Sequence, residues 1–140
     1  MTDQLFEKGE LQAHAEQAVT TLLEHIGEDP GRNGLKDTPK RVVKALQQMT
    51  AGYHVNIASL LSVTFDVHFD EMVVLTDIPF NSLCEHHMLP FTGTATVGYI
   101  PGTAGGVVGI SKLARLVEAH AQRLQIQERM TDDIAKDLNR

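Results

Sequence analysis

The sequence predicts an α+β fold, with an antiparallel sheet in the middle of the chain and helices at either end. Near both ends, apolar residues recur every three or four positions, as on the buried face of a helix. Between residues 63 and 70 they alternate with polar residues, as in a strand with one solvated face. Because the two patterns occupy separate parts of the 140 residues, we expect one α+β domain, helical over 1–52 and built from a sheet and two helices over 61–140.

Two helices are predicted in the N-terminal region. The buried face of the first comprises Leu11, Ala15, Val19, Leu22, Leu23 and Ile26, and Gly27 should end it. The second should begin with Thr38 as N-cap and Pro39 in the first turn, and its buried residues are Val42, Val43, Leu46 and Met49. Arg41 lies in the first turn, where a cation opposes the helix dipole, so it is a candidate for binding an anion. The alternative is a solvated surface arginine.

Four strands are predicted in the middle of the chain. Residues 63–70 form the first, with His68 on its solvated face; the others are Met72–Ile78, Thr94–Ile100 and Gly106–Gly109. Short connections between most of these strands favour antiparallel pairing. The stretch from Asn81 to Phe91 is then the connection between the second and third strands.

Two helical segments follow the sheet. The first has a buried face formed by Leu113, Leu116, Val117, His120, Ala121 and Leu124. Ser111, Lys112 and Arg115 lie near its beginning and off that face, which indicates either a phosphate site or an ordinary solvated surface. The second segment, Gln127–Arg140, places Met130, Ile134 and Leu138 four residues apart. Glu128 lies in its first turn, where an acid also complements the helix dipole.

The connection from Asn81 to Phe91 contains the strongest signal for chemistry. It holds the only cysteine of the sequence, Cys84, and its only adjacent histidine pair, His86 and His87. Cys84 and His87 are three residues apart, so a tight turn can direct both side chains at one Zn²⁺ ion. His86 would then be free to act as a general acid or base near neutral pH. The alternative is an inert buried thiol beside polar loop histidines.

Composition limits the classes of function. A single cysteine excludes an internal disulfide, and the chain has no apolar run long enough for a signal peptide or a membrane helix, so we expect a cytoplasmic protein. The net charge of −6 argues against a nucleic-acid or membrane partner. A local basic pocket for an anion remains compatible with it.

Four motifs resemble GTP cyclohydrolase I in their order and approximate spacing. They are Cys84-Glu85-His86-His87, the run from Ser111 to Arg115, Gln127-Glu128-Arg129, and the run from Asp37 to Arg41. The resemblance extends from Leu11 to Arg140. It implies the tunnelling fold, in which antiparallel sheets of several subunits join into a barrel, commonly as a homodecamer of two stacked rings of five. It also implies hydrolysis of GTP at C8, release of formate and closure of the ring of 7,8-dihydroneopterin triphosphate.

The resemblance implies a role for each matched residue. Cys84 and His87 would be zinc ligands, and His86 the catalytic proton donor. Glu128 would accept the N1–H and N2–H of guanine, while the main chain of Gln127 helps to recognise the base. The ribose and triphosphate would be bound by Ser111, Lys112, Arg115 and Arg41.

The sequence departs from the family pattern at its end. In the family a later His-x-Cys motif provides a further histidine and the third zinc ligand, and another phosphate-binding arginine follows. We therefore expect this chain to be truncated and to lack C-terminal strands. The competing interpretations are an inactive remnant that acts as a nucleotide-binding or interaction module, and a tunnelling-fold enzyme in which Cys84 is a covalent nucleophile.

Overall fold

The computed structural model describes residues 8–67, 69–102 and 106–139. They form two compact units that divide between Gln48 and Met49. No helix in these ranges is long and apolar enough to cross a membrane. The expectation of a single domain over 1–140 stays a prediction.

The first unit consists of two helices, α1 (Lys8–His25) and α2 (Thr38–Met49). Gly27 follows α1 with a φ of +89°, and the N–H of Glu28 donates to the carbonyl of Leu23 at 3.0 Å. This left-handed glycine closes the helix, as predicted. The second helix begins at Thr38 itself, and Asp37 precedes it with its carbonyl accepting from the N–H of Arg41 at 3.1 Å. The N-terminal end of α2 is therefore one residue earlier than the sequence predicted.

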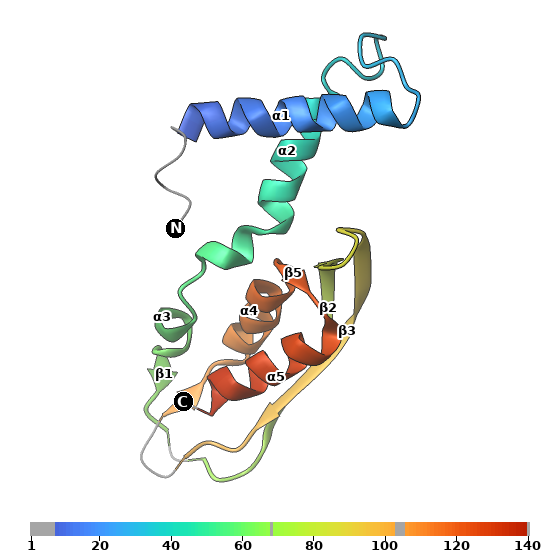
Figure 1. The fold of residues 1–140 in the computed structure, drawn as a ribbon. Coiled ribbons are helices and arrows are strands. Elements are labelled where there is room, and N and C mark those ends of the chain that lie inside the picture. The colour runs from blue at the N-terminus through green and yellow to red at the C-terminus, as the bar shows by residue number, and fades with distance from the viewer. Residues whose placement is uncertain (1–7, 68, 103–105, 140) are drawn as a thin grey trace. The chain divides into compact units, whose positions relative to one another are not determined.

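The second unit contains a three-stranded and a two-stranded sheet (Figure 1). β2 (Val73–Cys84) lies between β3 (Pro90–Tyr99), which is antiparallel to it, and β5 (Leu124–Gln125), which pairs in parallel with Leu83 and Cys84. β1 (Thr64–Phe65) and β4 (Val107–Val108) form the second, antiparallel sheet. Two short helical elements, η1 (Ala51–His54) and α3 (Ile57–Leu61), precede β1.

Four predictions about this sheet region were wrong in detail, among them the third strand, which begins at Pro90 and not at Thr94. The first predicted strand is reduced to Thr64–Phe65, and His68 lies outside the described residues. The second predicted strand continues to Cys84, so this residue ends a strand instead of lying in a loop. The helical period predicts Leu124 on the buried face of a helix, but this residue belongs to β5. No local pattern indicated this parallel strand.

A β-bulge in β2 determines which side chains face the core. Leu75 is opposite Val97 and Ile78 is opposite Ala95, so β2 has one extra residue between these pairs. Asp77 occupies the bulge with a φ of +55°. Before it the odd-numbered residues Val73 and Leu75 are the more buried ones, and after it the even-numbered Ile78, Phe80 and Ser82 are, while Leu83, which pairs with β5, is buried as well. The extra residue therefore reverses the alternation of the strand.

The core lies between this sheet and two helices, α4 (Ile110–Ala121) and α5 (Gln127–Leu138) (Figure 1). Its buried members are Ile78, Val97, Leu113, Leu116, Val117, Ala121, Met130 and Ile134. These agree with the faces that the helical period predicted for both segments. The core includes a polar contact, because the ring Nε2 of His120 lies 2.8 Å from a carboxylate oxygen of Asp137 and joins α4 to α5.

Candidate active site

A tight turn after β2 gathers the side chains of the first motif. The N–H of Met88 donates to the carbonyl of Cys84 at 2.7 Å, and the N–H of Cys84 donates to the carbonyl of Leu89 at 2.8 Å. Met88 has a φ of +58°, a left-handed conformation that reverses the chain within a few residues. As a result, Cys84, His86 and His87 lie on one short turn.

The separation of Cys84 and His87 fits two corners of a zinc site. The sulfur of Cys84 lies 3.5 Å from Nδ1 of His87 and 3.9 Å from Nδ1 of His86. With Zn–S near 2.3 Å and Zn–N near 2.0 Å, two ligands of a tetrahedral ion are about 3.5 Å apart. The described residues contain no group of three or more metal-ligating side chains. They provide a ligand pair, and a complete site needs at least one further ligand.

The environment of Cys84 favours its thiolate. The main-chain N–H of His86 donates toward the sulfur and lowers the pKa of the Cys84 thiol, against an opposing contribution from burial. The N–H of His87 and the imidazole of His86 act in the same direction. Since the thiolate is the form that binds metals and attacks electrophiles, the turn prepares Cys84 for either role.

The parallel strand β5 brings the third motif beside this turn. The N–H of Glu85 donates to the carbonyl of Gln125 at 3.1 Å, and α5 begins two residues later with Gln127 and Glu128. Both side chains are exposed in the first turn of α5. The structure thus places the candidate guanine-binding residues next to the candidate metal ligands, although they are about 40 positions apart in sequence.

A side-chain network that the sequence did not reveal joins the turn to α5. The guanidinium of Arg129 is paired with the carboxylate of Glu85. It also donates to the side-chain oxygen of Gln125 and to the carbonyl of Leu124, each at 3.2 Å. One signal was present in the sequence, because a cation in the first turn of a helix opposes the dipole and needs a compensating partner.

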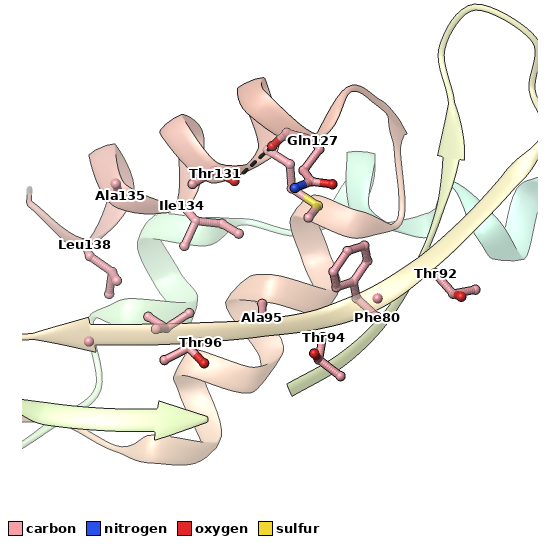
Figure 2. Close-up of a pocket in the computed structure, with 14 residues that line it drawn as sticks. Phe80, Thr92, Thr94, Ala95, Thr96, Gln127, Thr131, Ile134, Ala135 and Leu138 are labelled. Atoms are coloured by element: carbon pink, nitrogen blue, oxygen red, sulfur yellow. Dashed lines mark hydrogen bonds between the residues drawn. The ribbon is translucent and has the colours of Figure 1, made fainter. Parts of the chain in front are cut away.

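Gln127 also borders a groove between β3 and α5 (Figure 2). The groove measures about 330 Å³, and Phe80 and Thr92 lie toward the same end as Gln127, with Ile134 and Leu138 further along. The hydroxyl of Thr131 donates to the carbonyl of Gln127 at 2.9 Å. One end of the groove therefore lies at the N-terminus of α5 (Figure 2).

The predicted phosphate residues lie on other elements than the Cys84 turn. Ser111 and Lys112 lie at the beginning of α4, whereas the end of that helix leads into β5 (Figure 1). With twelve residues, α4 is about 18 Å long. Arg115 lies beside Ile78–Asn81 of β2, at a separate depression on the surface. Arg41 belongs to the first unit, where it forms an exposed ion pair with Asp37 at 3.4 Å.

Comparison with known proteins supplies the family. The sequence profile of GTP cyclohydrolase I matches residues 15–140. The chain is 53% identical over 129 residues to GTP cyclohydrolase 1 of Mycolicibacterium vanbaalenii, and the match covers 92% of this chain and 64% of that protein. The protein of the same name from Streptomyces griseus is 52% identical over 124 residues, which are 89% of this chain and 62% of the relative.

A third relative gives the same result. GTP cyclohydrolase 1 of Corynebacterium aurimucosum is 52% identical over 121 residues, with 86% of this chain and 62% of the relative covered. The chain therefore spans a little less than two thirds of the length of these curated relatives. With four motifs in order, an α+β structure and a profile match over most of its length, the chain belongs to the GTP cyclohydrolase I family.

Proposed function

We propose that this chain is part of an enzyme that hydrolyses GTP at C8, releases formate and forms 7,8-dihydroneopterin triphosphate. The observation that carries the proposal is the 3.5 Å separation between the Cys84 sulfur and Nδ1 of His87, beside the N-terminus of α5 in a chain of this family. Cys84 and His87 would hold zinc, which supplies activated water for the attack on C8.

In this proposal the side chains around the ligand pair bind the base and move protons. The imidazole of His86 is exposed on the same turn and would donate a proton to the purine as the C8–N bond breaks. The Glu128 carboxylate would accept both guanine donors, N1–H and N2–H, because two parallel donors match its two oxygens. The main chain of Gln127 would contact the same base.

We further propose that the enzyme is a cytoplasmic homo-oligomer, with the decamer of two stacked pentamers as its expected form. Ser111, Lys112 and Arg115 would bind the ribose and triphosphate, with Arg41 as a further phosphate ligand. Within one chain, Ser111 and Lys112 lie in the first turn of α4, whereas Cys84 pairs with β5, which follows the other end of that helix. A neighbouring copy in the oligomer would therefore bring these cations to the substrate.

The test uses an extended chain, in which residues 1–140 are followed by the C-terminal segment of the M. vanbaalenii relative. We expect it to release one formate for each GTP consumed and to hold about one zinc per subunit. Cys84→Ala should abolish both properties. The 140-residue chain by itself should bind zinc weakly, because two protein ligands leave most of the coordination to water.

The results also separate the competing interpretations. An extended chain that binds GTP but releases no formate, with zinc present, would support the inactive remnant instead. The lowered pKa of Cys84 favours a second candidate, a covalent role for its thiolate. That role requires a substrate adduct on Cys84, detectable by mass spectrometry, and turnover without zinc.

A further inference from the structure

We propose that Arg129 is a positioning residue that acts through Glu85 to hold the Cys84–His87 turn in register with the N-terminus of α5. This inference rests on the proposed function and adds a residue to it. Arg129 would touch neither substrate nor metal. Its contribution is to keep the ligand pair and His86 at a constant position relative to Gln127 and Glu128.

Arg129 contacts three acceptors in two segments of the chain, the turn and β5. Its guanidinium pairs with the Glu85 carboxylate in the turn, and it donates to the side-chain oxygen of Gln125 and to the carbonyl of Leu124 in β5. Gln125 is itself held, since its amide donates to the carbonyl of His120 at 2.9 Å and only 2% of the residue is exposed. Arg129 therefore connects the turn to a buried, hydrogen-bonded support.

Glu85 transmits this restraint to the reactive part of the turn. It stands between Cys84 and His86, and its main-chain N–H is fixed to the carbonyl of Gln125. One carboxylate oxygen faces Arg129, while the other lies 3.8 Å from Nε2 of His86. Movement of Glu85 would displace the residues on both sides of it, because they share one tight turn.

Stability is a poor explanation for this arrangement. Both side chains of the ion pair are partly exposed, and such pairs contribute little to the free energy of unfolding. A cation in the first turn of α5 also opposes the helix dipole. For holding the turn, the planar geometry of the guanidinium matters more than its charge, because its N–H groups can donate to a carboxylate, an amide oxygen and a carbonyl at the same time.

The experiment compares Arg129→Lys and Arg129→Ala in the extended chain, with kcat and KM for GTP and the zinc affinity as readouts. Lysine keeps the positive charge but cannot donate to three acceptors as the planar guanidinium does. Both variants should therefore lower kcat per folded, zinc-loaded subunit by at least about tenfold, because small displacements of reacting groups reduce the rate strongly. KM should stay within about threefold, since Gln127 and Glu128 are unchanged. Zinc affinity, measured by competition with a chromophoric chelator, should fall about tenfold.

Glu85→Gln tests whether the effect passes through Glu85. In that background, Arg129→Lys should lower kcat by no more than about twofold further, because residues that act as one unit are not additive. Lys136→Ala is the matched control: it removes a cation from the same helix, one that pairs with Asp132, and should leave kcat unchanged.

Several results would overturn the proposal. A normal kcat for Arg129→Lys would contradict it, whatever the melting temperature of the variant. So would a double variant in which the reductions of kcat caused by Arg129→Lys and Glu85→Gln simply multiply. A raised KM with unchanged kcat would make Arg129 a substrate ligand. If the unaltered extended chain has no cyclohydrolase activity, the proposed function fails, but the zinc affinities still decide the role of Arg129.

Discussion

At the scale of single residues, Glu128 has two competing roles. Its carboxylate is exposed in the first turn of α5, where an acid complements the helix dipole and a guanine base could also be received. Its neighbour Gln127 borders the groove beside β3, and the Cys84 turn lies next to the same helix end. The two roles affect different quantities, so one substitution distinguishes them.

We expect Glu128→Gln in the extended chain to reduce GTP binding or turnover by at least about tenfold with little change in stability, because each charge-assisted hydrogen bond contributes about 1.5–3 kcal/mol. Glutamine keeps the size of the side chain but turns an NH₂ group toward a guanine donor. A dipole role predicts instead a stability loss of about 0.3–1 kcal/mol with normal kinetics. Melting temperature and GTP kinetics of the same protein decide between them.

Gly52 shows how one missing side chain permits a close contact. This buried residue of η1 donates its N–H to the carbonyl of Gln122 at 3.0 Å. A Cβ added there would lie 2.1 Å from the carbonyl oxygen of Ala119 and 2.7 Å from that of Gln122. Both obstacles are backbone atoms at the end of α4, which cannot move aside without disturbing the helix.

Gly52→Ala should therefore destabilise the protein by about 2 kcal/mol or more, as overpacking against backbone usually does. Urea unfolding monitored by circular dichroism provides the measurement. Gly9→Ala in α1 is the control, because among the described residues no atom beyond its chain neighbours and its own helix backbone lies within 4 Å of the added Cβ, and alanine favours a helix by up to about 1 kcal/mol. Equal effects of both substitutions would contradict the steric argument.

At the scale of elements, the bulge in β2 positions the site. Without the extra residue between Leu75 and Ile78, inward and outward side chains would alternate unchanged along the whole strand. From that point to Cys84, the residues that now face solvent would then face the helices. Asp77 adopts the required left-handed conformation, which aspartate and asparagine tolerate better than other residues with side chains.

Substitutions at Asp77 should follow backbone preference, since its side chain is exposed. We expect Asp77→Asn to be nearly neutral and Asp77→Val to destabilise by about 1–2 kcal/mol, the cost of a left-handed conformation for a residue with a β-branch. Chemical denaturation of both variants provides the test. A neutral Asp77→Val would show that the bulge relaxes without cost.

At the scale of the whole molecule, the outer edge of β3 is the feature that we expect to control self-association. Among the described residues β3 pairs only with β2, and its edge beside the groove carries no further strand. A long, unpaired edge is a template for pairing with another chain. Thr94 and Thr96 are exposed residues of β3, and both line the groove.

The 140-residue chain should therefore associate with itself as its concentration rises, as measured by sedimentation velocity. The double variant Thr94→Lys/Thr96→Lys should weaken this association, because charged side chains protect sheet edges. Gln47→Lys, a charge added to the exposed surface of α2, should not weaken it. A stable monomer at every concentration would show that this edge does not drive assembly.

Features that depend on local pattern could be predicted from the amino-acid sequence. The helical periods located α1, α2, α4 and α5, and the spacing of Cys84 and His87 predicted a tight turn, in which the Cys84 sulfur lies 3.5 Å from Nδ1 of His87. The four motifs in order predicted the family, which the profile match confirms. These features depend on residues close in sequence, whose geometry follows from one helix or one turn.

The way in which these parts combine could not be predicted from local pattern and follows from the three-dimensional packing. The parallel pairing of β5 with β2, the bulge at Asp77 and the Glu85–Arg129 pair join residues that no local period relates. The position of Ser111 at the end of α4 remote from β5 likewise follows from the direction in which α4 runs. Such features depend on pairings between distant segments, which are selected by how the whole core packs and therefore leave no periodic signal in the sequence.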